Sequence, residues 1–237
     1  MSSVLFNNLT SKEKSEAIEH LIENSSPRAD FFLMVVLSIV MATLGVLIDN
    51  TAVVIGSMLI APMLYSVLSF SLALVLLDWK LFGRSCWSIV KSVFFSLLAA
   101  VVVTFLFAPH TGSPSQNFEV ISRIQPDVVW FAVAFVAGLA GSFALTKPHL
   151  GETLPGVAIS VSLIPPLAVS GVGFALFDWE IMIKSFQLFL INAAGIALAS
   201  FAVFFLMKFQ VERRAAKQAV KKEQKLIEKE KEKAEED

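Results

Sequence analysis

Six long apolar segments, separated by short polar joins, run through most of the chain. They cover residues 31–48, 51–77, 86–108, 128–145, 154–177 and 181–207. The first holds eighteen uncharged residues, about 27 Å of helix, which nearly matches a hydrocarbon core of about 30 Å. The second and fifth carry prolines near their middle, Pro62 and the pair Pro165 and Pro166, and a proline inside a helix removes a hydrogen bond and bends it. The pattern predicts an all-α integral membrane protein of six transmembrane helices, with the second and fifth broken.

The second and fifth segments also resemble each other in sequence. Leu59-Ile60 aligns with Leu163-Ile164, Pro62 with Pro166 and, after a gap of four residues, Asp78-Trp79 with Asp178-Trp179. Each copy lies in a unit of three spans, and an odd number of spans turns the second unit upside down relative to the first. We therefore predict a 3+3 inverted repeat. Its units are 31–108 and 128–207, joined by an extracytoplasmic loop at 109–127.

The charges of the loops orient these spans. With the N-terminus inside, the basic residues of the two inner loops are Lys80, Arg84 and Lys147, whereas the outer loops keep only Arg123 and Lys184. The alternative topology makes both proline segments re-entrant hairpins and leaves a single basic residue in the inner loops. Because basic residues concentrate on the cytoplasmic side, the bias favours six full spans with both termini cytoplasmic.

The two ends of the chain are polar. Within residues 1–30, Thr10 and Glu13 fit a capping box, and the pattern behind them predicts an amphipathic helix from about 11 to 24 that lies on the membrane or on the domain. Residues 208–237 predict that the sixth span continues as a charged cytoplasmic helix, either solvated or self-associating. Its stretch 208–225 carries seven basic residues against two acids, so anionic lipid is an expected partner besides the bilayer itself.

The composition is typical of a membrane protein and excludes several kinds of chemical site. Hydrophobic residues make up 56% of the chain and charged residues 16%, against about a quarter charged in soluble domains. The sequence has one cysteine and three scattered histidines, which excludes an internal disulfide and a cysteine-based metal site. It shows no acid pair, nucleophile–base set or glycine-rich phosphate loop. We expect no enzymatic activity, no cofactor, no metal and no nucleic-acid partner.

The candidate site lies where the two broken spans meet. Their prolines free backbone carbonyls near the membrane midplane, and serines precede them within two turns. The predicted substrate-binding residues are Ser57, Pro62, Ser160, Ser162, Pro165, Pro166 and Asn192. Two broken helices at matching places in inverted repeats are typical of a transport site. The alternative is a structural kink covered by neighbouring helices, with Asn192 making a hydrogen bond across a helix contact.

The join of the first two spans and the small residues of two others suggest further roles. Asp49 and Asn50 could bind an ion, or Asn50 could cap the second helix. The run from Gly138 to Ser142 indicates close helix packing first of all. Together with the alanines and glycine after Asn192 and the charged C-terminal helix, it also predicts a homo-oligomer.

Two motifs resemble those of a known family. They are AVVIGSMLIAPM at 52–63 and LPGVAISVSLIPPLAVSGVG at 154–173. They are similar to the paired signatures of an uncharacterised bacterial hydrophobic membrane-domain family, domain of unknown function 389. The resemblance covers roughly 31–207 and implies a bacterial or archaeal-type inner membrane protein. It implies no substrate and no catalytic residue.

Two functions of different class remain open. One is a transporter or channel for a small solute or ion, with its site at the two broken helices. The absence of a buried Asp, Glu or Arg pair within the spans then favours a neutral solute, or an ion held by carbonyl and hydroxyl oxygens. The other is a scaffold or sensor that transports nothing and acts through its charged cytoplasmic tail.

Overall fold

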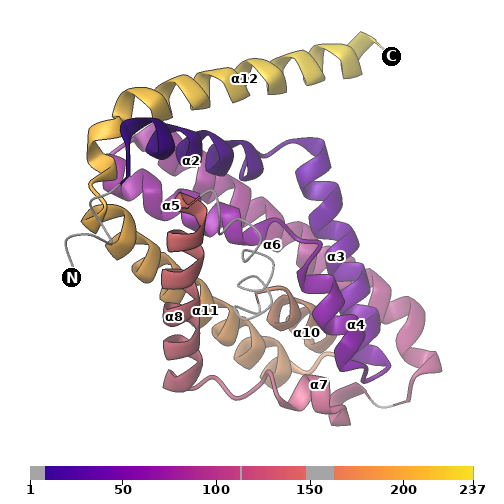
Figure 1. Cartoon of the computed structure of the whole chain (residues 1–237). Coiled ribbons are helices and arrows are strands. Elements are labelled where there is room, and N and C mark those ends of the chain that lie inside the picture. The colour runs from indigo at the N-terminus through magenta and orange to yellow at the C-terminus, as the bar shows by residue number, and fades with distance from the viewer. Residues whose placement is uncertain (1–8, 113, 148–162, 237) are drawn as a thin grey trace.

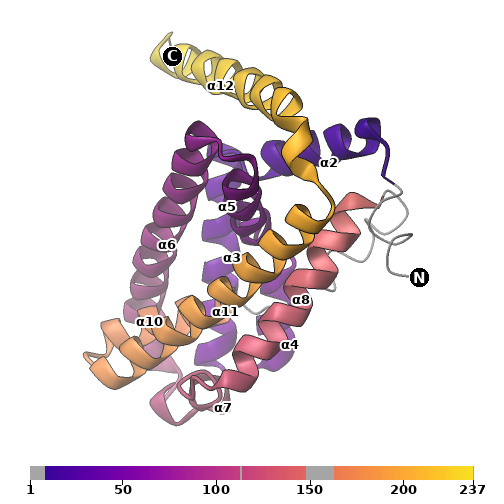
Figure 2. The same cartoon turned by 90° about the vertical axis from the view of Figure 1, so that its left-hand side faces the viewer.

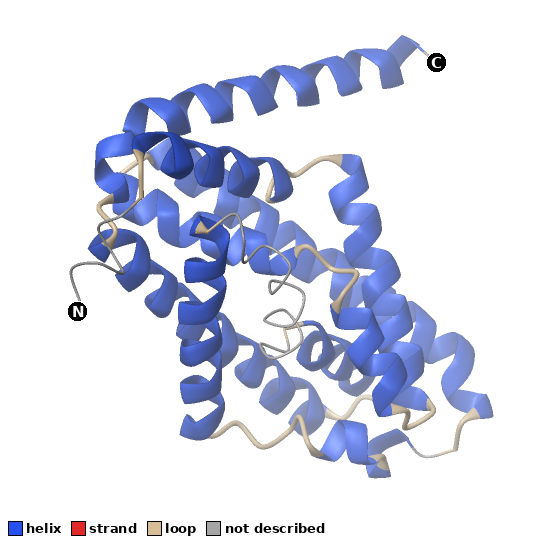
Figure 3. Ribbon diagram, viewed as in Figure 1, coloured by secondary structure: helices blue, strands red, loops and turns tan. Residues whose placement is uncertain are grey.

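Helices make up all the regular structure that the computed structural model describes, in residues 9–112, 114–147 and 163–236 (Figure 3). Four helices are long and apolar enough to cross a membrane: α3 (Ala29–Leu47), α6 (Trp79–Phe107), α8 (Val128–Thr146) and α11 (Trp179–Leu206). The bent pair α4 (Thr51–Met58) and α5 (Met63–Leu76) makes a fifth span when counted as one. The chain is thus a multi-pass, all-helical membrane protein across its described residues.

The helices form a bundle with two different ends. α2 (Ser11–Asn24) and α12 (Arg213–Glu236) lie across one end, which we call the α12 end (Figure 1). The short α7 (Phe118–Ile121) lies at the other, the α7 end (Figure 2). The joins between α3 and α4 and between α10 and α11 also lie at the α7 end in both views.

One short helix, α10 (Ile164–Ala175), occupies the interior. It packs against α3, α4, α6 and α11. Almost all of its side chains are buried, including both prolines of its first turn. A helix that is apolar on every side is expected in the core of a bundle. The first part of the predicted fifth span, 154–162, lies outside the described residues.

The two Asp-Trp joins adopt the same turn. Leu77 and Phe177 each take a left-handed conformation, with φ of 50° and 57°. The next backbone N–H donates to a carbonyl five residues earlier, Asp78 to Ala73 and Asp178 to Gly173. Each aspartate then caps the following helix through its carboxylate. This is the Schellman arrangement followed directly by an N-cap.

Helix boundaries differ from the predicted ones at two places. α6 begins at Trp79, seven residues before the predicted start at 86, because the Asp78 carboxylate accepts hydrogen bonds from the N–H groups of Lys80 and Leu81. The charged tail forms a helix as predicted, α12, but it does not continue the sixth span directly. α11 ends at Leu206, Lys208 takes φ 58°, and a 3-10 turn, η4 (Phe209–Glu212), precedes α12. This change of direction buries Phe209.

The predicted N-terminal helix is confirmed, and the charged tail is not simply solvated. α2 has the predicted bounds and its capping box at Thr10. It lies on the domain, with its apolar face buried. α12 packs along α2 through its first half. The α12 residues buried there are Ala216, Ala219, Val220 and Glu223.

The small residues of α8 and α11 pack against each other. A Cβ added at Gly138 would lie 2.8 Å from Ile196 Cα and 2.9 Å from Ala199 Cβ. One added at Gly195 would lie 2.9 Å from Ala134 Cβ. The predicted close packing at Gly138 is confirmed. Since these contacts lie within one chain, the same glycine faces cannot also join two copies.

We predict that Gly138→Ala destabilises the protein. The new methyl group would overlap the backbone of α11, and overpacking of this kind costs about 1–3 kcal/mol. Gly83→Ala is the matched control, because no atom lies within 4 Å of its added Cβ, and alanine gains up to about 1 kcal/mol over glycine in a helix. Unfolding in mild detergent measures both variants. Equal stability of the two would contradict the packing.

Candidate functional site

Two helices begin inside the bundle without a side-chain cap. α5 begins at Met63 after Pro62, and α10 begins at Ile164. Three helices that begin at the ends of the bundle are capped: Asn50 caps α4, Asp78 caps α6 and Asp178 caps α11. α3, which also begins at an end, has no side-chain cap. An uncapped N-terminus keeps the positive end of its helix dipole free to act on a nearby polar group. These two starts form the centre of the candidate site.

The break between α4 and α5 bends the pair by 44°. Ser57, at the end of α4, is buried, and its hydroxyl donates to the Val54 carbonyl at 2.6 Å. The carbonyl of Ser57 accepts a hydrogen bond from the Ser38 hydroxyl of α3, also at 2.6 Å. The same carbonyl also accepts from the Ile60 N–H at 3.2 Å, so Ser38 adds a second donor at the break. Sequence reasoning did not single out Ser38, whose role depends on a contact between helices.

The second proline segment is more deeply buried than the first. Pro165 and Pro166 are buried in the first turn of α10, whereas Pro62 is half-buried. Asn192 is 2% exposed on α11, which packs against α10. α4 and α10 are in contact, so the two broken segments meet in the interior. The predicted residues Ser160 and Ser162 lie outside the described residues.

Several buried hydroxyls in the bundle have no hydrogen-bond partner among the described residues. They are those of Ser66 on α5, Ser92 and Ser96 on α6, and Ser185 on α11. The two on α6 continue a line of four buried serines at helical spacing, which begins with Ser85 and Ser88. Ser85 is bonded to Ser69 of α5 at 3.0 Å. The spacing is visible in the sequence, but sequence reasoning missed this line.

An unpartnered buried hydroxyl costs about 1–3 kcal/mol. The protein therefore retains Ser92 and Ser96 at some expense of stability. Such hydroxyls are suited to donate to, and accept from, a water molecule or a small polar solute. Side chains that could hold a metal ion do not gather in groups of three or more within the described ranges.

At the α7 end, a buried carboxylate joins the loop between α6 and α8 to the start of α4. Glu119 is 1% exposed. Its Oε1 accepts from the Thr51 hydroxyl at 2.5 Å, and its Oε2 lies 2.7 Å from Nη1 of Arg123. Burial lowers the pKa of Arg123, and the charge of Glu119 and a hydrogen bond to it act in the opposite direction. Glu119 was not among the residues singled out from the sequence.

The predicted ion-binding pair adjoins this carboxylate. The Asp49 carboxylate accepts from the backbone N–H of Glu119 at 2.9 Å. Asn50 caps α4, with its side-chain oxygen accepting from Val53 N–H at 3.1 Å. The capping alternative is confirmed for Asn50. Ion binding by the pair stays a prediction.

At the α12 end, a second buried carboxylate joins three elements. The side chain of Glu223 on α12 is 4% exposed. Its Oε2 lies 3.6 Å from Nη1 of Arg28, before α3, and 3.9 Å from Nη2 of Arg84, on α6. The Arg84 guanidinium also donates to the Ser26 hydroxyl. Breaking a buried ion pair of this kind leaves an uncompensated charge, so the cluster holds α12 against α6 and the residue before α3.

Comparison with known proteins gives a family without an assigned activity. Residues 58–198 match the model described as domain of unknown function DUF389. An uncharacterised protein of Methanocaldococcus jannaschii is 31% identical over 172 residues, which is 73% of this chain and 52% of that relative. The chain thus spans about half the length of this curated relative. No solved structure matches the chain.

We predict that Ser92→Ala stabilises the protein by about 1 kcal/mol, because it removes a buried hydroxyl that has no partner. Ser142→Ala is the control. The Ser142 hydroxyl donates to the Gly138 carbonyl at 2.7 Å, so its removal is expected to be neutral or destabilising by up to about 1 kcal/mol. Thermal unfolding in detergent compares the two. A destabilised Ser92→Ala would mean that the hydroxyl has a partner in the folded protein.

Proposed function

Because this chain belongs to the family of domain of unknown function 389, which brings no activity with it, we propose a function from geometry: a membrane transporter or channel for a small solute or ion. The observation that carries the proposal is the pair of helix starts inside the bundle, α5 at Met63 and α10 at Ile164. Half-length helices that begin within a membrane protein are characteristic of transport sites.

The lengths of the helices support similar depths for the two starts. α4 has 8 residues between the α7 end and the break, and α10 has 12 residues between its start and the α7 end. At 1.5 Å per residue these lengths are about 12 Å and 18 Å. If the α7 end marks one boundary of the hydrocarbon core, which is about 30 Å thick, both starts fall near its middle.

Hydroxyl and carbonyl oxygens are the polar groups nearest to these starts along the chain. Ser57 lies just before the break, and the unpartnered Ser66 lies one turn into α5. The charged clusters at Glu119 and Glu223 lie at the two ends of the bundle instead. This chemistry favours a neutral solute, or an ion held by oxygen dipoles, over proton-coupled transport by a buried carboxylate.

Six spans arranged as a 3+3 inverted repeat fit this function, because two exchangeable halves can give alternating access to one site. The identical turns at Leu77 and Phe177 support the repeat. α2 and α12 lie at the same end (Figure 1), as expected when both termini are cytoplasmic. A homo-oligomer would use faces other than the glycines of α8 and α11, for instance the exposed apolar residues of α6.

A scaffold or sensor is the second candidate. It is favoured by the docking of α12 on α2, since a charged helix fixed by a buried carboxylate presents a defined surface. In that case the bundle is an anchor and the outer half of α12 binds a partner.

Cysteine labelling tests the topology in a Cys86→Ala background. We expect Lys80→Cys to react with a membrane-impermeant maleimide only after the cells are opened, and Ser115→Cys to react in intact cells. Both positions are exposed in the structure. The reverse pattern would refute six full spans with cytoplasmic termini, and it is the pattern expected if both proline segments are re-entrant hairpins. Reaction of both positions in intact cells would show that α6 does not cross the membrane.

Flux in proteoliposomes tests transport. With glycerol, urea and potassium as probes, we expect the native protein to raise permeability to one of them. Ser57→Ala and Pro166→Ala are expected to reduce this flux on the order of tenfold, the effect of losing about 1.4 kcal/mol of stabilisation. Gly83→Ala and a chain ending after Lys225 are expected to retain it. No rise in permeability to any of the three probes would favour the scaffold. Unchanged flux in folded Ser57→Ala and Pro166→Ala would contradict a transport site at the two broken helices.

A further inference from the structure

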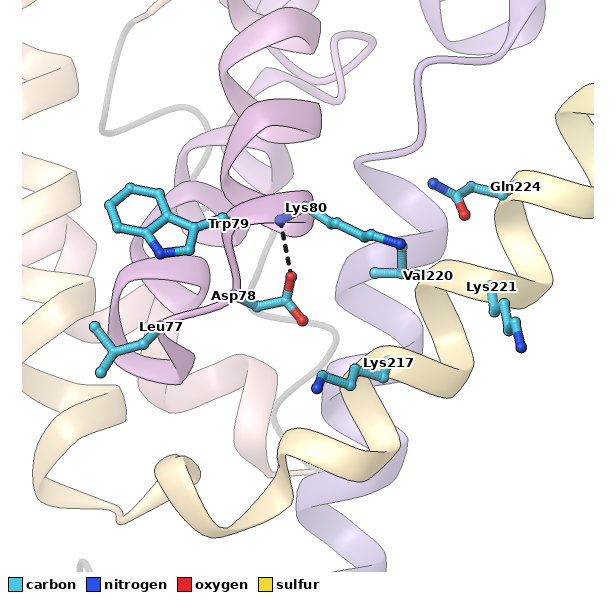
Figure 4. Close-up of a pocket in the computed structure, with 8 residues that line it drawn as sticks. All are labelled: Leu77, Asp78, Trp79, Lys80, Lys217, Val220, Lys221 and Gln224. Atoms are coloured by element: carbon cyan, nitrogen blue, oxygen red, sulfur yellow. Dashed lines mark hydrogen bonds between the residues drawn. The ribbon is translucent and has the colours of Figure 1, made fainter.

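A cavity of about 480 Å³ opens between the α5–α6 join and α12 (Figure 4). α12 contributes one wall and the first turn of α6 contributes the other. Eight residues line it: Leu77, Asp78, Trp79, Lys80, Lys217, Val220, Lys221 and Gln224. Its volume falls within the range of about 300–1,000 Å³ that is usual for ligand sites.

The cavity is basic, and its three lysines outnumber its one carboxylate. Lys80 and Lys217 point toward the space beside Asp78, while Lys221 points away along α12 (Figure 4). Within the described part of the chain, none of the three forms an ion pair. By contrast, their neighbour Lys222 pairs with Glu19 of α2 at 2.5 Å.

The one carboxylate in the cavity lining, that of Asp78, already accepts hydrogen bonds from the backbone. One oxygen of Asp78 accepts from the N–H groups of Lys80 and Leu81, at 3.0 and 3.1 Å. With three lysines and one aspartate, the lining carries a formal net charge of +2. An anion would therefore find an excess of positive charge there.

The mouth of the cavity is apolar and lies at the start of a predicted membrane span. Leu77 is 67% exposed and Trp79 is 75% exposed. Exposed leucine and tryptophan beside lysines, at the end of a span, match the level of lipid headgroups, where an indole ring is favoured. A soluble anion would gain nothing from these two side chains.

We propose that this cavity binds the headgroup of an anionic phospholipid. The phosphate lies between Lys80 and Lys217, and the glycerol and first acyl carbons lie against Leu77 and Trp79. The basic stretch 208–225 by itself indicates only a diffuse attraction to anionic lipid. The cavity adds Lys80 from the first unit and so makes a site that spans α6 and α12. This proposal does not depend on whether the protein transports anything.

The experiment uses the full chain in mild detergent and measures retained lipid by native mass spectrometry and lipid-induced thermal stabilisation. Phosphatidylglycerol is the probe, phosphatidylcholine the zwitterionic comparison, and inorganic phosphate the soluble anion. The test variant is Lys80→Ala/Lys217→Ala. The control is Lys225→Ala/Lys229→Ala, which removes two exposed charges from α12 outside the cavity lining.

We expect the native protein to retain phosphatidylglycerol in preference to the other two probes. The test variant is expected to bind it about tenfold or more weakly, and the control within about twofold of the native protein. Both variants should unfold at the native temperature without lipid, since all four lysines are exposed. Equal loss in both variants would show diffuse attraction and overturn the site. So would equal binding of phosphatidylcholine, or equal stabilisation by inorganic phosphate.

Discussion

Hydrocarbon offers no hydrogen bonds to a protein backbone, and this constraint decides where the broken helices of this chain can lie. α4 ends at Met58 and α10 begins at Ile164, and each of these ends interrupts a helical hydrogen-bond ladder inside the bundle. Other helices enclose α10 on several sides, and the Ser38 hydroxyl donates a hydrogen bond to the carbonyl of Ser57. The long helices around this centre then meet lipid with unbroken, internally bonded backbones.

The local features of the fold were predictable because they depend on neighbours in the sequence. The capping box at Thr10 and the cap at Asn50 each need only a side chain three residues from a backbone N–H. Most of the predicted spans follow from hydropathy for the same reason. The start of α6 was missed because its first turns, from Trp79 to Ser85, contain two basic residues and are less apolar than the rest.

The features that were not predictable depend on contacts between distant residues. Nothing near Glu223 in the sequence indicates that it contacts Arg28 and Arg84. The sequence after Met207 also does not indicate that the chain turns where Phe209 packs on Phe204, with ring centroids 5.2 Å apart. The candidate site shows the same division. Ser57 and the prolines follow from the repeat, whereas the buried state of Ser92 and Ser96 follows only from their neighbours.

The pairing of Glu223 with two arginines also bears on how the protein is made. The ribosome delivers α12 after α2, α3 and α6, so the carboxylate arrives at an end of the bundle that is built from much earlier residues. Until then Arg84 lacks the counter-charge of Glu223, and the face of α2 that α12 later covers remains open. A chain released before Glu223 would carry both defects permanently. An unfinished copy would therefore differ from a finished one at a single end of the molecule.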